Sequence, residues 1–170
     1  MQRPQSTEHN PYFLKYIGLV PEGNYFDLLM QNTEDVVNTF MNLSEEKQNY
    51  SYAPGKWTPK QMLMHLMDTE RGMSYRALIA ARGDSEHLIQ TLDEDLYAAN
   101  AVVDNRSIDD LLEEFAAIRF TTRKLFEGMT EEQTTWTANV TNGRVSARAL
   151  GYMMLGHATH HLNVLKERYF

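Results

Sequence analysis

Gly156-His157-Ala158-Thr159-His160-His161-Leu162 lies near the end of the chain, inside a helix that the sequence predicts over residues 146–169. Leu150, Met154 and Leu165 recur at helical spacing around this stretch and mark one apolar face of the helix. His157 and His161 fall on the same face, where a bundle helix would ordinarily carry leucine. A buried imidazole nitrogen without a partner costs roughly 1–3 kcal/mol, so two histidines on a core face need specific partners.

Two histidines one helical turn apart can bind a single metal ion. Their spacing along the helix axis is about 6 Å, which suits a His-x-x-x-His pair of metal ligands. The alternative is a pair of ordinary core histidines with hydrogen-bond partners, and the pair alone leaves both interpretations open. His160 lies off the apolar face, and we interpret it as a flanking or supporting group.

A third histidine lies in another strongly apolar segment. Thr58-Pro59-Lys60-Gln61 combines a capping box with proline at the first helical position, and predicts a helix over 58–82. His65 is the only polar side chain among residues 62–67. Asp68 follows closely and could orient His65, either beside a metal or in an ordinary core pair. If this helix and the last one face one interior, three histidines with an open position describe a catalytic metal site.

Two further helices are predicted over 24–42 and 107–128. Their apolar residues step alternately by three and four positions, which is the packing seam of a helix bundle. The four helices together predict an all-α, antiparallel four-helix bundle. The Asn-Gly pair within 140–145 is compatible with a small hairpin. The long acidic connection over 84–106 is a candidate rim for a site.

Composition limits the classes of protein to which the chain can belong. Its 170 residues suit one domain, with an irregular aromatic arm over 1–21 and the bundle domain over 22–170. The absence of cysteine excludes disulfides and thiolate ligands. The net charge of −7 argues against nucleic-acid binding. No apolar run reaches the roughly 18–20 residues of a membrane span, and no signal peptide is evident, so we expect a cytoplasmic protein.

Two motifs resemble those of the DinB-like (YfiT-like) bundle family. The first is Trp57-Thr58-Pro59-Lys60-Gln61 followed by His65, Asp68 and Glu70, and the second is Gly156-His157-x-x-His160-His161 followed by Leu165, Arg168 and Tyr169. The match extends over about residues 22–170 in order and spacing. The resemblance implies a bacterial four-helix bundle, commonly a homodimer, in which three histidines hold a divalent metal. Carried over by position, these are His65, His157 and His161.

The resemblance implies a metal site and leaves the reaction open. Because members of the family include thiol-dependent S-transferases, we expect an enzyme that acts on a small molecule with a low-molecular-weight thiol as cosubstrate. A metal-dependent hydrolase and a non-enzymatic, metal-binding stress-response protein are the alternatives. Three imidazoles accept zinc, nickel, iron or copper, with zinc or nickel expected first. Asp68, Glu70 and His160 are candidates for supporting roles, and the sequence identifies no general base.

Overall fold

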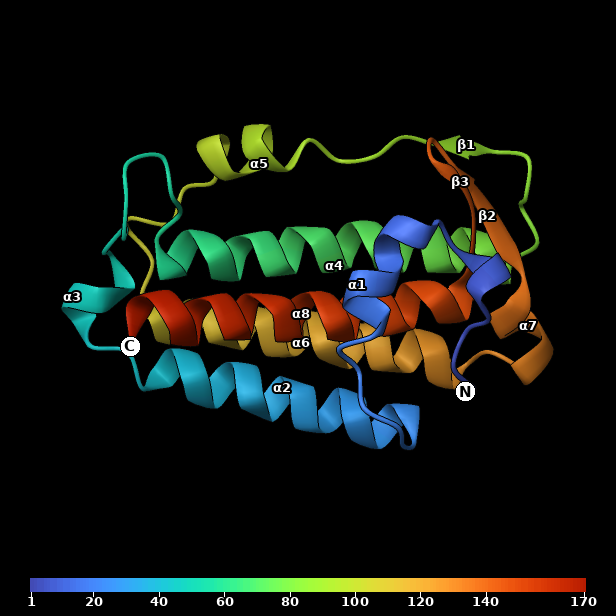
Figure 1. Cartoon of the computed structure of the whole chain (residues 1–170), viewed down its shortest axis with the longest axis horizontal. Helices are drawn as coiled ribbons and strands as arrows, with labels where there is room; N and C mark the ends of the chain where they lie inside the picture. The colour runs from blue at the N-terminus through green and yellow to red at the C-terminus, as the bar shows by residue number, and fades with distance from the viewer.

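Four long helices form a bundle in the computed structural model, which describes all residues from 1 to 170 (Figure 1). They are α2 (Tyr25–Met41), α4 (Pro59–Ala81), α6 (Ile108–Glu127) and α8 (Ala147–Tyr169). Each follows a side chain whose oxygen accepts a hydrogen bond from a backbone N–H of the first turn: Asn24, Thr58, Ser107 and Ser146. The four predicted helices are confirmed, and each end lies within one residue of its predicted position.

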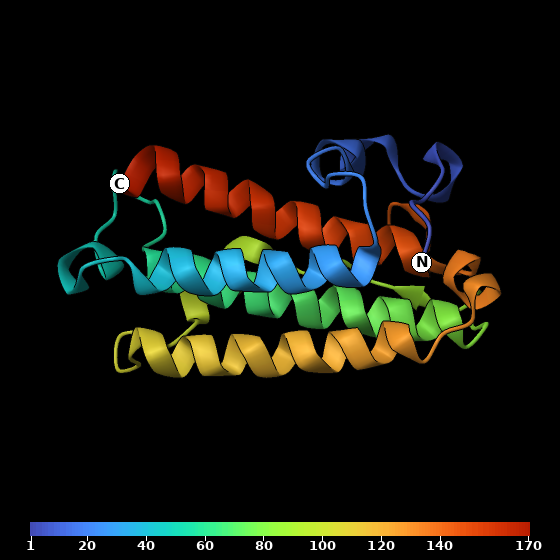
Figure 2. The ribbon, with the colours of Figure 1, turned by 90° about the horizontal axis from the view of Figure 1, so that it is seen from below.

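The directions of the helices differ from the antiparallel bundle that the sequence predicts. Glu70 on α4 pairs with Arg119 on α6, and one turn further along both helices Ser74 contacts Thr122, so α4 and α6 are parallel. Figures 1 and 2 show α2 and α8 running together in the opposite direction. The physical reason is the connection over 82–107, which returns along α4 and starts α6 at the end of the bundle where α4 starts.

A small three-stranded sheet closes one end of the bundle, so the chain is mostly helical rather than all-α. Its strands are β1 (Leu88–Ile89), β2 (Thr137–Val140) and β3 (Gly143–Ser146). The antiparallel pair β2–β3 confirms the predicted hairpin, and Gly143 supplies the positive φ of 116° that its turn requires. The strand β1, which was not predicted from the sequence, pairs with β2 in parallel across about 50 residues of intervening chain.

The remaining elements are short. They are 3₁₀ turns at Ser6–Glu8 and Pro11–Phe13, and the helices α1 (Leu14–Ile17), α3 (Glu45–Gln48), α5 (Glu94–Asn100) and α7 (Glu131–Thr135). The N-terminal arm, with both 3₁₀ turns and α1, lies on the outer side of α8 (Figure 2). None of the helices combines the length and the apolar character needed to cross a membrane.

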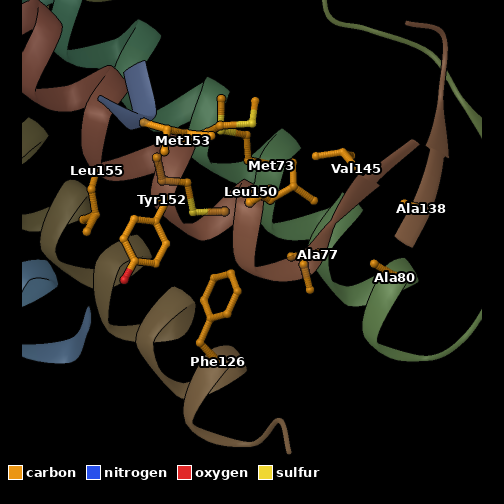
Figure 3. Close-up of a cluster of buried hydrophobic side chains, with 14 of the residues drawn as sticks. Met73, Ala77, Ala80, Phe126, Ala138, Val145, Leu150, Tyr152, Met153 and Leu155 are labelled. Carbon is orange, nitrogen blue, oxygen red and sulfur yellow. The ribbon is translucent and has the colours of Figure 1, made fainter. Parts of the chain in front are cut away.

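The apolar core has two clusters, one toward each end of the bundle. The hairpin cluster brings α4, α6 and α8 together with β2 and β3, and Figure 3 shows its central side chains: Met73, Ala77, Ala80, Phe126, Ala138, Val145, Leu150, Tyr152, Met153 and Leu155. The C-terminal cluster fills the other end with, among others, Phe40, Leu63, Leu111, Phe115 and Leu165.

Buried polar residues separate the two clusters on every long helix. Asn32 lies between them on α2, Glu70 on α4, Arg119 on α6 and His157 on α8. Each is at most 8 % exposed. Burying such groups costs free energy unless they are paired, so this polar layer marks the region of the bundle where a functional site is expected.

Candidate metal centre

The structure brings His65, His157 and His161 together from two helices. His65 lies on the second turn of α4, which the Thr58–Gln61 capping box and Pro59 fix in place. The two other histidines lie one turn apart on α8, which packs against α4. His65 and His157 are each 6 % exposed, and His161 is partly buried. The juxtaposition that the sequence analysis proposed is therefore present.

The ring nitrogens converge on one point. Nε2 of His157 lies 3.1 Å from Nε2 of His65 and 3.1 Å from Nε2 of His161. One ring N–H can serve only one of these contacts, so His157 cannot satisfy both neighbours by donating a hydrogen bond. Tetrahedral coordination with Zn–N bonds of 2.0–2.1 Å would hold ligand nitrogens about 3.3 Å apart. The three donor atoms, which all lie within 4.8 Å of one another, fit a single ion of this kind.

Burial keeps these imidazoles neutral, which is the form that binds a metal. Burial lowers the pKa of His65 to about 4 and the pKa of His161 to about 3. It also lowers the pKa of His157 well below the usual histidine value, and the neighbouring imidazoles lower it further. The carboxylate of Asp95 partly opposes the effect of burial on the pKa of His65.

Aromatic rings enclose the cluster. The Trp57 ring lies 4.6 Å from the ring of His65 and stacks on His161 at 6.3 Å, measured between ring centroids. Tyr16, from the N-terminal arm, meets His157 edge-on at 5.4 Å between centroids. These rings exclude water from part of the site and thereby strengthen its electrostatic interactions.

A cleft of about 280 Å³ opens beside His161. Its walls come from the loop before α4, from the first turn of α4, from α5 and from the last turns of α8. They comprise Tyr52, Gly55, Lys56, Trp57, Met62, Asp95, His160, His161, Val164 and Tyr169. The acidic connection over 84–106 does contribute to this rim, through Asp95. A small molecule in the cleft would therefore reach the histidine cluster from the side of His161.

The other candidate residues have different neighbours. Asp68 pairs with Arg71, and burial raises the pKa of its carboxyl group. Glu70 pairs with Arg119 inside the polar layer, so neither carboxylate contacts His65. His160 lines the cleft instead of joining the three-histidine cluster.

Sequence reasoning assigned no role in the site to Trp57, Tyr16 or Asp95. Trp57 could have been found from the sequence, because it directly precedes the capping box of α4, which fixes the path of the adjoining residues. Tyr16 comes from the arm and Asp95 from α5. The positions of these segments depend on tertiary packing, and no local sequence pattern predicts them.

Comparisons with known proteins identify the fold and the family. The chain matches the structure of a Bacillus subtilis protein, YfiT, described as "a probable metal-dependent hydrolase with an unusual four-helix bundle topology". The TM-score is 0.74 at 15% sequence identity, and the alignment covers 98% of this chain and 90% of that one, so the likeness shows a shared fold. No curated protein matches the chain. The family model of the DinB superfamily matches residues 28–165. The chain, with its three histidines gathered in this bundle, therefore belongs to the DinB superfamily.

Proposed function

We propose that this protein is a metal-dependent enzyme in which His65, His157 and His161 hold one divalent ion. The convergence of three Nε2 atoms beside an open cleft carries the proposal. Three protein ligands leave a coordination position free, which is the arrangement of catalytic rather than structural zinc sites. Among the four metals that imidazoles accept, we propose zinc or nickel.

Hydrolysis of a small molecule is the reaction that we propose first. A bound ion would supply Lewis-acid activation of a nucleophile at neutral pH. The residues around it would shape the reaction: Trp57 shields His65 and His161 from solvent, and the cleft admits the substrate beside His161. Asp95 provides the acidic side chain of the same cleft and is the group we propose to accept a proton from the nucleophile, directly or through one water molecule. The description of the YfiT structure as a probable hydrolase supports this choice.

Transfer to a low-molecular-weight thiol is the second candidate. Since the chain has no cysteine, the thiol would have to be a cosubstrate. Lys56 lines the cleft, and its ammonium group suits the carboxylates that small cellular thiols of the peptide type carry. A panel of activated esters and amides, and of electrophiles with and without added thiol, separates the two reactions. Turnover that requires the thiol favours transfer, and turnover without it favours hydrolysis.

Elemental analysis of purified variants tests the metal site. We expect about one divalent ion per chain in the wild-type protein, and its loss in His65→Ala, His157→Ala and His161→Ala. His160→Ala is the matched control, because it removes a neighbouring imidazole that is outside the cluster, and it should retain the ion. Equal loss in His160→Ala would contradict the ligand assignment. A wild-type protein whose ion exchanges no solvent ligand would favour the non-enzymatic alternative.

We also propose that the protein is a cytoplasmic homodimer. The family resemblance supports the dimer, and the absence of cysteine suits a reducing compartment. Light scattering at micromolar concentration should give twice the 19.7 kDa mass of one chain. A mass of one chain across that concentration range would contradict the dimer.

A further inference from the structure

The backbone of the N-terminal arm touches α8 directly beside the metal centre. A Cβ atom on Gly156 would lie 1.9 Å from the carbonyl oxygen of Tyr16 and 2.4 Å from its carbonyl carbon. No side chain fits in that space, so the approach depends on glycine at the residue before His157. In Figure 1, α1 crosses α8 at the middle of its length.

This contact places one aromatic ring against the histidines. The Tyr16 ring meets His157 edge-on at 5.4 Å and His160 at 5.6 Å, measured between centroids. Trp57 packs on the other two members of the cluster, His65 and His161. Each of the three histidines therefore packs against an aromatic ring from outside the long helices. The ring comes from the N-terminal arm for His157 and from the loop before α4 for the other two.

The arm is held in this position by contacts away from Tyr16. Ile17 and Val20 are buried in the hairpin cluster, at 3 % and 4 % exposure. The Nε atom of Arg148 near the start of α8 donates to Glu8 at 2.7 Å. The guanidinium group of Arg3 donates to the carbonyl oxygen of Ile17 at 3.0 Å. The arm is thus a packed part of the fold, and Tyr16 is carried on a fixed support.

Packing rather than hydrogen bonding orients these rings. Metal-binding histidines usually donate their second ring N–H to a carboxylate or carbonyl group, which fixes the ring. Here the Nδ1 atom of His161 is buried and has no hydrogen-bond partner in the protein. The side-chain hydrogen-bond contacts of His157 are the two Nε2 contacts with His65 and His161, and the edge of the Tyr16 ring packs on it.

We propose that the N-terminal arm is a structural part of the metal centre, in which Tyr16, seated on Gly156, is a positioning residue for His157. By fixing that ring, the arm slows release of the ion. This inference rests on the proposed metal site. It assigns a role to residues that precede the part of the chain matched by the family model, which starts at residue 28.

The rate of zinc transfer from the 170-residue protein to excess chelator tests the proposal. Tyr16→Ala should release zinc about 10-fold faster or more, the loss typical of an outer partner of a metal ligand. Tyr16→Phe keeps the ring and should behave as the wild type. Tyr12→Ala is the matched control in the same arm, because Tyr12 is 60 % exposed and packs on Tyr16 and Phe13 rather than on a histidine.

Gly156→Ala independently tests the close contact between Gly156 and the backbone of Tyr16. The added methyl group should displace Tyr16 and accelerate release as Tyr16→Ala does, with a changed visible spectrum in the cobalt-substituted protein. Gly72→Ala is its control within a long helix, since its methyl group would meet only the end of the Leu92 side chain. Far-UV circular dichroism establishes that each variant is folded. If Gly156→Ala does not fold, the release rate of Tyr16→Ala alone tests the role of the arm.

The outcomes separate this inference from the proposed function. A wild-type protein that binds no zinc would overturn the metal site, and the role of the arm with it. A wild-type protein that binds zinc, together with a folded Tyr16→Ala variant that releases it at the wild-type rate, would overturn the role of the arm alone. Faster release in Tyr12→Ala, to the same extent as in Tyr16→Ala, would also overturn it.

Discussion

At the scale of single residues, the three histidines are the groups whose protonation most strongly links pH to stability. In an unfolded chain a histidine has a pKa near 6.5 and takes up a proton below that value. In the folded protein burial lowers the pKa of His65 to about 4 and that of His161 to about 3. Between these values the unfolded state binds protons that the folded state does not, so acid favours unfolding.

The first prediction at this scale concerns the metal-free protein. Its free energy of unfolding should be constant with respect to these groups above pH 6.5. It should fall as the pH is lowered toward 4, by about 1.4 kcal/mol per pH unit for each histidine that stays neutral. His161→Gln should reduce this slope by the contribution of one proton, as measured by urea unfolding between pH 7 and 4.5. His87→Gln, at an exposed position, is the control and should leave the slope unchanged. Equal slopes in wild type and His161→Gln would contradict the prediction.

A second prediction concerns the ion pair of the polar layer. Glu70 and Arg119 have side chains only 3% and 4% exposed, and Oε2 of Glu70 lies 2.7 Å from Nε of Arg119. That N–H is not aligned with the oxygen as in a hydrogen bond, and Oε1 of Glu70 has no partner at all. Glu70→Gln would leave a buried guanidinium charge uncompensated, which should lower the free energy of unfolding by about 3–5 kcal/mol.

The double variant Glu70→Met/Arg119→Met separates two effects on the free energy of unfolding. One is the destabilisation by an unpaired buried charge, and the other is the net contribution of the ion pair. Since well-packed apolar replacements of buried ion pairs are often neutral or stabilising, the double variant should recover most of the stability lost in Glu70→Gln. Glu114→Gln, in a more exposed ion-pair network, is the control and should cost far less. A double variant as unstable as Glu70→Gln would contradict this account. Denaturant unfolding at pH 7 measures all three.

At the scale of the elements, local signals were sufficient for the long helices. Side-chain caps and heptad spacing involve residues within a few positions of one another, so the helix ends could be predicted from residues such as Thr58 and Ser107. The same holds for the β2–β3 hairpin, whose Asn-Gly turn is a local signal. The positions of His65, His157 and His161 on core faces follow from the same periodicity, which is why the cluster could be proposed from the sequence.

The directions of the elements could not be predicted in this way. Whether α4 and α6 are parallel depends on the path of the connection between them, and that path is fixed by weak, distant contacts such as the β1–β2 pair. The placement of α5, which brings Asp95 to the cleft, has the same origin. Tyr16 reaches His157 only because α1 crosses α8, a contact between segments 140 residues apart along the chain. Non-local packing therefore decided where Asp95 and Tyr16 lie in the site.

At the scale of the whole molecule, the polar layer raises the question of whether the two apolar clusters fold as one unit. The hairpin cluster and the C-terminal cluster share no buried side chain. Each of the four long helices nevertheless runs through both, so melting one end would break four helices within their length. Loss of the packing at one end would also expose the polar layer and remove the support of the three histidines. We therefore expect a single cooperative transition.

The chain has two tryptophans, which lie at opposite ends of the bundle and allow a direct test. Trp57 packs on His65 beside the C-terminal cluster, and Trp136 lies just before β2, beside the hairpin cluster. Trp136→Phe leaves Trp57 as the only reporter, and Trp57→Phe leaves Trp136. In each variant the fluorescence midpoint in urea should coincide with the midpoint from far-UV circular dichroism of the same variant. Comparison within one variant removes any effect of the substitution on stability itself.

A destabilising substitution at one end of the bundle gives a stricter test of the single cooperative transition. Leu150 is 1 % exposed in the hairpin cluster, and Leu150→Ala should cost about 2–5 kcal/mol through lost contacts and the cavity left behind. Made in the Trp136→Phe background, this change lies at the end opposite to the remaining reporter, Trp57. If the bundle is one cooperative unit, Trp57 fluorescence should shift to a lower urea midpoint by the full amount seen by circular dichroism. A Trp57 transition that keeps its original midpoint would mean that the C-terminal cluster, with the histidines beside it, unfolds independently of the end where the arm is anchored.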